Sequence, residues 1–295
     1  MNLIINHHLE LAARVAWVGL GLTLAMSISA QAESAKDKLP AKYRDAGVIK
    51  LATEAKYPPF ETFAEDGKTM VGFEVELWDE IAKRLGVKID AVSVAFDSLI
   101  PGVQSGRWDI AMEAISDNLE RQQVVSFVDY GYTTPAAYVL EGDAATDIPG
   151  LCGRKGGAQS GTEYVDVIAH RIAPACTKDG KPEPSSAEYG SADAVLLALY
   201  SGRVDFVITD SASAKEIKAN APKPVRILTS EAFPRPMSGI AFRKSETDLG
   251  QALLAALEEV MADGTYEAIY KKWDVLPMRL EIKPGINLET GNPMK

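Results

Sequence analysis

Ser105–Asp129, SGRWDIAMEAISDNLERQQVVSFVD, has the pattern of a helix ending, a short strand and the beginning of another helix. Ser105-Gly106 supplies the glycine that ends an apolar helix in the left-handed conformation. The run from Trp108 to Ile115 is typical of a short buried strand. This order of elements indicates one unit of an open α/β sheet.

Arg121 is the candidate binding residue of this stretch. Asp117 or Asn118 can cap the second helix, and Glu120 stands three residues after Asp117, as in a capping box. Arg121 is then placed one turn into the helix, just past the end of a strand, where open α/β sheets bind ligands. A guanidinium at that position is suited to hold a carboxylate or a phosphate through two hydrogen bonds.

The composition indicates a globular protein with room for two domains. The chain has 295 residues, of which 46% are hydrophobic and 24% charged, as in ordinary soluble domains. A formal net charge of -10 argues against nucleic acid or an anionic membrane as a partner. The chain has three histidines and two cysteines without a metal-ligand spacing, so we expect no metal site and no cofactor.

Residues 1–32 have the pattern of a cleaved export signal. Arg14 precedes the apolar run from Val15 to Ile28, and Ala30-Gln31-Ala32 offers a small-residue cleavage site. A membrane anchor is the alternative, but the run is shorter than the roughly 20 residues that span a bilayer. No lipobox cysteine follows. We therefore expect a periplasmic protein without membrane insertion after signal removal, with residues 33–45 as a polar lead-in.

Strands and helices then alternate, which predicts parallel strands with crossover helices. The first elements are a strand at Val48–Thr53, a helix at Phe73–Leu85 and a strand at Val87–Val94. A second such region spans about 141–234, where Ser201-Gly202-Arg203-Val204-Asp205 repeats the helix ending of Ser105-Gly106-Arg107-Trp108-Asp109. The repeat indicates two lobes of the same construction, although two similar helix endings can also arise by chance.

Cys152 and Cys176 are the only cysteines of a chain with an export signal, so a disulfide between them is the favoured state. Two buried free thiols are the alternative. The tail after Pro277 has no clear periodicity, and we expect it to be extended on the surface or partly disordered.

Four stretches resemble the periplasmic amino-acid-binding proteins of ABC transporters, the polar amino acid type of solute-binding protein family 3. They are Tyr57-Pro58-Pro59-Phe60 with Gly72–Leu77, Phe96–Pro101 with Ser105–Asp109, Glu120–Gln123 with Phe127, and Ala262–Tyr266. The resemblance covers most of residues 46–275. It implies the type II periplasmic-binding-protein fold, in which two lobes, each a mostly parallel sheet flanked by helices, are joined by two crossing hinge strands.

In this fold the chain returns to its first lobe. The resemblance therefore implies that residues 46–139 and 240–276 form lobe 1, residues 140–239 form lobe 2, and residues 277–295 form a C-terminal extension. Hinges are expected near Tyr138–Gly142 and Arg235–Gly239.

The resemblance also implies the residues of a ligand site, which needs a cation for the carboxylate of an amino acid and an anion for its ammonium group. Arg121 matches the family's carboxylate-binding arginine, and Asp210 matches its ammonium-binding aspartate. Supporting positions are an aromatic lid, a serine near the carboxylate and a Gly-Thr turn, which correspond to Tyr57, Ser116 and Thr162.

Three carboxylates depart from the family pattern and favour a cationic or strongly polar ligand. Glu54 stands where an aspartate often contacts the far end of the ligand, and Glu163 replaces a hydroxyl of the Gly-Thr turn. Glu113 adjoins Ala114, which stands where many members have serine. Glu113 and Glu163 can equally point to solvent or pair with lysines. Strand alternation places Glu113 and Ala114 on opposite faces, so both should not line one pocket.

The leading hypothesis is a monomeric, non-catalytic binding protein that delivers an amino acid to an inner-membrane ABC permease. An enzyme on the same fold, similar to cyclohexadienyl dehydratase, is the alternative, with Glu113 or Glu163 as general acid or base. An accessory protein of a periplasmic oxidoreductase is a third interpretation.

Overall fold

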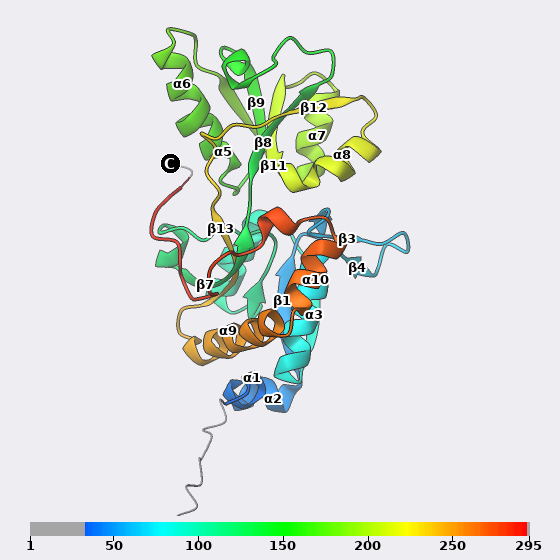
Figure 1. Ribbon diagram of the computed structural model, residues 1–295, viewed down its shortest axis with the longest axis vertical. Coiled ribbons are helices and arrows are strands. Elements are labelled where there is room, and N and C mark those ends of the chain that lie inside the picture. The colour runs from blue at the N-terminus through cyan, green and yellow to red at the C-terminus, as the bar shows by residue number, and fades with distance from the viewer. Residues whose placement is uncertain (1–32, 294–295) are drawn as a thin grey trace, which may run out of the picture. The chain divides into compact units, whose positions relative to one another are not determined.

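The computed structural model describes residues 33–293, so the predicted signal peptide lies outside the described residues. Two α/β lobes make up this part of the chain, each around a five-stranded sheet (Figure 1). Lobe 1 comprises residues 33–132 and 237–293, and lobe 2 comprises residues 135–228. The segments 133–134 and 229–236 connect the two lobes. Within the described residues, no helix is long and apolar enough to cross a membrane.

The sheet of lobe 1 has the strand order β5-β1-β6-β13-β7. The strands are β1 (Val48–Thr53), β5 (Lys88–Ser93), β6 (Ile110–Ala111), β7 (Val125–Tyr132) and β13 (Met237–Arg243). Strands β5, β1 and β6 are parallel, and β13 runs antiparallel to both of its neighbours. The helices of this lobe are α1 (Ala35–Lys38), α2 (Ala41–Ala46), α3 (Phe73–Leu85), α4 (Leu99–Ser105), α9 (Thr247–Ala262) and α10 (Thr265–Lys272). A small sheet of β2 (Lys56–Tyr57), β3 (Glu61–Phe63) and β4 (Met70–Val71) is attached to it.

Lobe 2 has the strand order β10-β9-β11-β8-β12. Its strands are β8 (Pro135–Leu140), β9 (Lys155–Gln159), β10 (Ser185–Tyr189), β11 (Phe206–Asp210) and β12 (Val225–Leu228). Its helices are α5 (Tyr164–Val167), α6 (Ala173–Lys178), α7 (Ala192–Tyr200) and α8 (Ala214–Asn220), with a π-helical turn between α5 and α6. The prediction of two α/β lobes is confirmed, and both sheets are mixed because β8, β12 and β13 run antiparallel to their neighbours.

The repeated sequence after each predicted helix ending has the same structural role in both lobes. Helices α4 and α7 end beside Gly106 and Gly202, which both have positive φ. Asp109 then accepts a hydrogen bond from the backbone N–H of Lys50, and Asp205 accepts one from Lys155. In each case the aspartate holds the neighbouring parallel strand in register, so the repeat reflects construction rather than chance.

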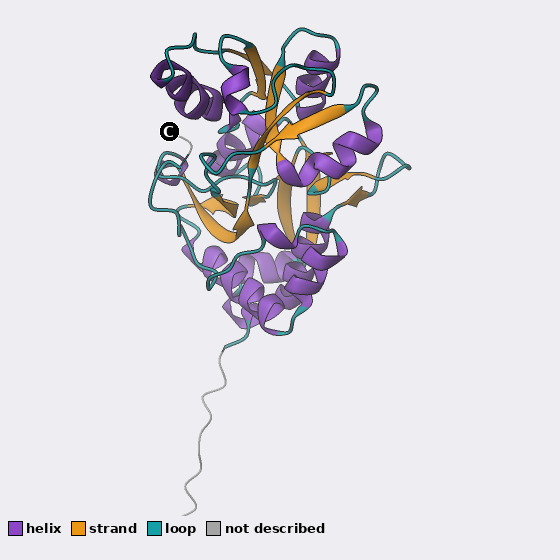
Figure 2. Cartoon of the chain, turned by 45° about the horizontal axis from the view of Figure 1, so that its top comes forward, coloured by secondary structure: helices purple, strands orange, loops and turns teal. Residues whose placement is uncertain are grey.

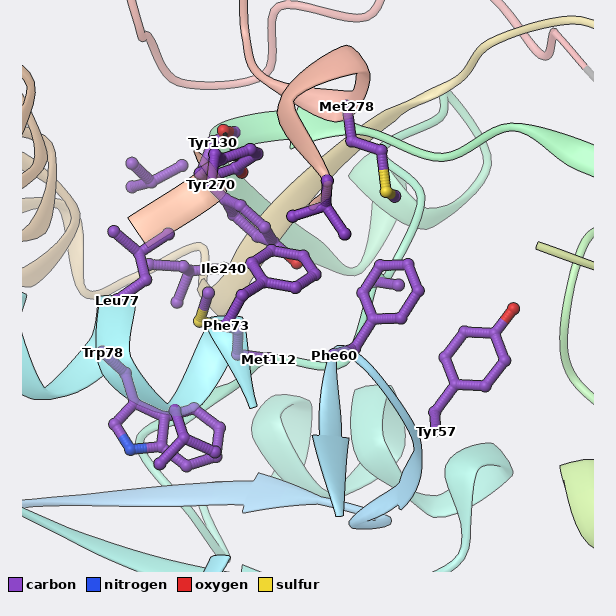
Figure 3. Packing of buried hydrophobic residues seen from close by; sticks show 14 of the residues in the cluster. Tyr57, Phe60, Phe73, Leu77, Trp78, Met112, Tyr130, Ile240, Tyr270 and Met278 are labelled. Carbon is purple, nitrogen blue, oxygen red and sulfur yellow. Dashed lines mark hydrogen bonds between the residues drawn. The ribbon is translucent and has the colours of Figure 1, made fainter. Parts of the chain in front are cut away.

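Aromatic rings connect the core of lobe 1 to its surface at Tyr57 (Figure 3). Tyr57 stacks on Phe60 with ring centroids 4.8 Å apart, Phe60 lies 5.0 Å from Phe73, and Phe73 lies 5.2 Å from Tyr270. Each such ring pair contributes about 0.5–1.5 kcal/mol of stability beyond the contribution of the area that it buries. Tyr57 is therefore held by a rigid row of rings that begins at α10.

The connections between the lobes differ from their predicted positions. The chain first crosses at Thr133–Thr134, before the predicted Tyr138–Gly142, because β8 already pairs with β11 and β12 of lobe 2. The return segment, 229–236, lies beside the first, and Thr133 donates to the carbonyl of Pro236 at 3.0 Å. β7 and β8 are both buried almost along their whole length, so burial does not mark the boundary between the lobes.

Residues 33–45 are not a polar lead-in. They begin α1 and α2, and Ala35, Leu39 and Tyr43 are buried in the core of lobe 1. In lobe 2, Cys152 and Cys176 form the predicted disulfide. Closing a loop of this length stabilises the folded chain by roughly 3 kcal/mol in the chain-entropy model.

The C-terminal segment 285–293, here called the strap, has no helix or strand (Figure 2) and is extended on the surface, as one of the two expectations had it. It is hydrogen-bonded along the edge strand β7. Asn287 donates its backbone N–H to the carbonyl of Phe127 at 3.0 Å and accepts from the Phe127 N–H at 2.8 Å. Further along, the Leu119 N–H donates to Gly291, and Arg171 of lobe 2 donates to the carbonyl of Pro293. The strap thus covers a sheet edge that would otherwise be open to pairing and contacts both lobes.

Two buried aspartates lie beneath the strap. Asp117 accepts from the Glu289 N–H at 3.2 Å, and Asp129 accepts from the Leu288 N–H at 2.8 Å. Burial raises the pKa of Asp129 to about 8, with the Asp117 carboxylate adding to the effect. Burial likewise raises the pKa of Asp117 to about 6.

We predict that this pair makes stability depend on pH. Both pKa values are raised in the folded protein, so the folded state binds more protons than the unfolded one, in which aspartate titrates near 4. The free energy of unfolding should therefore fall as pH rises from about 4 to 8. The fall is at most about 1.4 kcal/mol per pH unit for each extra proton that the folded state binds. Urea unfolding across this range measures it. Asp129→Asn should make the fall less steep by the contribution of one proton, whereas the same change at exposed Asp90 should not. An unaltered slope in Asp129→Asn would contradict the assignment.

Candidate ligand-binding site

Tyr57 carries a hydroxyl from lobe 1 into lobe 2. It follows β1 in the hairpin strand β2, and its ring is held by Phe60. The hydroxyl lies 3.0 Å from that of Tyr164 and 3.1 Å from that of Thr209. It also accepts the backbone N–H of Asp210 at 2.9 Å. The predicted aromatic lid is thus placed at the contact between the lobes.

Asp210 ends β11, as predicted, but its carboxylate is covered. The side chain is fully buried and accepts from the backbone N–H groups of Thr134 and Ala212 at 2.6 and 2.7 Å. The Tyr164 hydroxyl approaches it at 3.5 Å. Asp210 therefore caps the turn after β11 while lying directly behind the two tyrosines. Burial raises the pKa of Asp210 to about 7.

Arg121 lies in a single 3-10 turn, Arg121–Gln123, instead of the predicted helix. The Asn118 side chain, not a capping box with Glu120, accepts the Arg121 backbone N–H at 2.8 Å. Strand β7 begins at Val125, so no room remains for a longer helix. The guanidinium donates to the carbonyl of Ser116 at 2.8 Å and, across the lobes, to that of Gly161 at 2.9 Å. Burial lowers the pKa of Arg121, and the charge of Glu163 opposes this shift.

Two more pairs of polar side chains join the lobes beside Arg121. Glu163 accepts from the Asn118 side chain at 2.5 Å. Glu54 accepts from the Gln159 side chain at 2.7 Å. All four of these residues are buried. Because buried charges are costly unless they are hydrogen-bonded, these pairs hold the two lobes together.

One small cavity collects most of the predicted site residues. Its volume is about 20 Å³, which is room for about one water molecule. Six predicted residues line this Arg121 cavity: Tyr57, Glu113, Ser116, Arg121, Thr162 and Glu163. Glu54 and Asp210 are not among its lining residues but hydrogen-bond with Gln159 and Tyr57, which are.

Glu113 and Ala114 both line this cavity, contrary to the expected alternation. Strand β6 ends at Ala111, and Ala114 has a φ of 46°, so the backbone turns before the alternation can continue. The Glu113 carboxylate accepts from the Thr53 hydroxyl at 3.2 Å and from the Glu54 N–H. It therefore faces the interior and neither solvent nor a lysine.

Glu113 belongs to a buried group of acidic side chains behind the cavity. Glu74 accepts from the Ala114 N–H at 2.9 Å and from the Tyr130 hydroxyl. Burial raises the pKa of Glu74 to about 7. Burial also raises the pKa of Glu61 and of Glu113 well above the usual range, with neighbouring carboxylates adding to the effect. Burial therefore disfavours the negative charges of this group, and Glu74 is only about half ionised at pH 7.

Two larger cavities adjoin the Arg121 cavity. One of about 410 Å³ lies between α7 and α8 and shares Tyr57, Gln159 and Tyr164 with it. The other, of about 490 Å³, lies outside Arg121 and shares Arg121, Thr162 and Glu163. In the described residues, no group of three or more acidic, histidine or cysteine side chains is arranged to hold a metal ion.

Sequence reasoning missed several residues that complete the site. Gln159 ends β9 just as Asp210 ends β11, so the rule that ligands bind at strand ends could have identified it. Asn118 was considered only as a helix cap. Tyr164 and Thr209 carried no local signal, because their roles depend on Tyr57 approaching from the other lobe.

A two-lobed α/β protein with a guanidinium between its lobes belongs to the class of solute-binding proteins. Residues 49–275 match the family model of the bacterial extracellular solute-binding proteins, family 3. The chain belongs to this family. The match ends before the strap.

Relatives with known names are amino-acid-binding proteins. The chain is 35% identical over 231 residues to a protein of Escherichia coli (strain K12) named "Putative ABC transporter arginine-binding protein 2", covering 77% of this chain and 91% of that one. It is 28% identical over 269 residues to the L-cystine-binding protein TcyJ of the same organism, covering 90% and 96%. An ancestral arginine-binding protein bound to arginine matches with a TM-score of 0.68 at 33% identity, covering 77% of this chain and 98% of that one. These relatives are binding proteins rather than enzymes, in agreement with the leading prediction.

We predict that Tyr57→Phe destabilises the contact between the lobes. The change leaves the Asp210 N–H without its acceptor, and a buried unpaired donor costs about 1–3 kcal/mol. Urea unfolding should show a loss of this size. Tyr189→Phe, which removes a hydroxyl from a half-buried tyrosine of lobe 2, is the control. Equal stability of the Tyr57→Phe and unaltered proteins would show that the hydroxyl does not join the lobes.

Proposed function

We propose that the protein is a periplasmic receptor that captures an amino acid with a polar or cationic side chain and delivers it to an inner-membrane ABC permease. The observation that carries this proposal is the convergence of Arg121, Ser116, Thr162 and Tyr57 on one cavity between two lobes. The names of the relatives, which include arginine-, histidine- and cystine-binding proteins, support the ligand class.

In this proposal Arg121 binds the ligand's carboxylate. Its guanidinium bonds to two backbone carbonyls, one from each lobe, at 2.8 and 2.9 Å. A carboxylate is a stronger acceptor for a guanidinium than a neutral carbonyl, so a ligand can replace these bonds. The Ser116 and Thr162 side chains lie around the same cavity and supply further polar contacts.

Ligand entry requires the lobes to separate, since a cavity of about 20 Å³ does not hold an amino acid. Separation moves Tyr57 away from Tyr164, Thr209 and Asp210, because Tyr57 alone of these four belongs to lobe 1. The Asp210 carboxylate behind the tyrosines then becomes accessible. We assign it to the ligand's ammonium group.

A thermal-shift screen of the twenty amino acids with ornithine, citrulline and polyamines tests the proposal as a whole. A ligand at a thousandfold excess over its Kd stabilises the folded protein by about 4 kcal/mol. A clear rise in Tm with at least one polar or cationic amino acid is expected. Failure of every compound to raise Tm would contradict the proposed ligand class.

We predict that Arg121→Ala weakens binding of the amino acid found in this screen by roughly 3–5 kcal/mol, because the ligand's carboxylate is then buried without a partner. Isothermal titration calorimetry measures the effect. Arg107→Ala, at an exposed arginine of the same lobe, should leave the affinity unchanged. Unaltered affinity in Arg121→Ala would remove Arg121 from the site.

We predict that binding also weakens below pH 7. The pKa of Asp210 is raised to about 7, and an ammonium group needs the ionised carboxylate. Protons therefore compete with the ligand as pH falls, and the affinity should drop by up to about tenfold per pH unit below 7. Titrations between pH 5 and 8 measure this slope. In Asp210→Asn the affinity should be low and without this slope; an equally steep slope in that variant would assign the titration to another group.

A further inference from the structure

Glu163 has an unusual place for a carboxylate in a site that is proposed to bind a carboxylate. It lines the Arg121 cavity and is 6% exposed. One of its oxygens, Oε1, accepts from Asn118 at 2.5 Å. The other, Oε2, is buried and has no hydrogen-bond partner among the described residues. An ionised oxygen that is buried without a donor is costly, so a nearby positive charge must offset it.

Arg121 is that positive charge. Of the charged groups that act on Arg121, Glu163 has the largest effect. Burial raises the pKa of Glu163, and the charge of Arg121 is the largest effect that opposes this shift. The guanidinium itself hydrogen-bonds to the carbonyls of Ser116 and Gly161, with no carboxylate on either bond. Arg121 and Glu163 therefore compensate each other's charge across the cavity.

The other carboxylate of the cavity does not disturb this balance. Glu113 accepts from Thr53 and Glu54, and burial raises its pKa well above the usual range, so its negative charge is disfavoured. The charged groups that line the cavity beside it are Arg121 and Glu163, which have opposite signs when Glu163 is ionised. A ligand's carboxylate meets a guanidinium that already has a carboxyl group opposite it, and it adds a negative charge beside Glu163.

We propose that Glu163 is a specificity-determining residue that competes with the ligand's carboxylate for Arg121, so that the site selects cationic compounds with little dependence on a carboxylate. This inference rests on the proposed function and refines its ligand class. Two carboxylates near one guanidinium repel each other, whereas an amine or guanidine without a carboxylate adds only a positive charge. The carboxylate of an amino acid should therefore add less binding free energy, relative to the decarboxylated amine, than it would beside a guanidinium without a neighbouring carboxylate.

Matched pairs of compounds test the inference: L-arginine and agmatine, L-lysine and cadaverine, and L-histidine and histamine. Each pair differs mainly in the carboxylate. Calorimetric Kd values are measured for the unaltered protein, for Glu163→Gln, and for Asp166→Asn as the matched control. The glutamine retains an acceptor for Asn118 and removes the charge. Asp166 also acts on Arg121 but lies in α5 outside the Arg121 cavity.

In the unaltered protein, the members of the best-binding pair should differ in Kd by less than about tenfold. Glu163→Gln should lower the Kd of the amino acid by at least about tenfold, which corresponds to 1.4 kcal/mol. It should not lower the Kd of the amine. Asp166→Asn should leave the ratio within each pair nearly unchanged.

An unchanged ratio in Glu163→Gln, or an equal shift in Asp166→Asn, would overturn the role of Glu163 while leaving the proposed function intact. A melting curve for each variant shows whether it is folded, and Glu163→Thr provides a second neutral replacement. Failure of all six compounds to bind, together with an amino acid screen without a hit, would overturn both the proposed function and this inference.

Discussion

The hydrogen bonds of the Tyr57 hydroxyl are the constraint on which the arrangement of the two lobes depends. This one group from lobe 1 meets two hydroxyls and a backbone N–H of lobe 2 within 3.1 Å. The row of rings from Tyr57 to Tyr270 fixes its position from behind. Contact between the lobes is therefore specified by polar groups that water or a ligand can satisfy equally well. A ligand can shift the lobes only by binding one arrangement more tightly than the other, and these exchangeable bonds provide that difference.

The strap gives the Arg121 turn a second support. The Leu119 N–H donates to Gly291, and the Gln122 side chain donates to the carbonyl of Glu289 at 2.8 Å. Arg121 lies between these two residues in the sequence, so the strap holds the chain on both sides of Arg121. A longer helix would have held Arg121 through its own backbone bonds. Here the single turn relies on a segment that is distant in the sequence, outside the part of the chain that matches the family.

Local patterns predicted two α/β lobes and singled out Arg121, and the resemblance to the family implied the two-lobed binding fold and most of the other residues around the cavity. The endings of α4 and α7 and the position of Asp210 at the end of β11 follow from short-range signals. The disulfide follows from a single pair of cysteines in a chain with an export signal. The predictions failed where distant segments decide the structure. The Arg121 helix was shortened by β7, and the strap and the buried α1 have roles that only their packing against lobe 1 reveals. The prediction that Glu113 and Ala114 lie on opposite faces was wrong, because a turn with positive φ at Ala114 interrupts the alternation.

A crystal structure of the protein with the tightest-binding amino acid of the screen tests the central claim most directly. The account predicts that the amino acid lies between the lobes with its carboxylate within about 3 Å of the Arg121 guanidinium and that the Tyr57 hydroxyl has left the Asp210 N–H. A ligand seated in the cavity between α7 and α8, with Arg121 still bonded to Ser116 and Gly161 and Tyr57 unmoved, would contradict it.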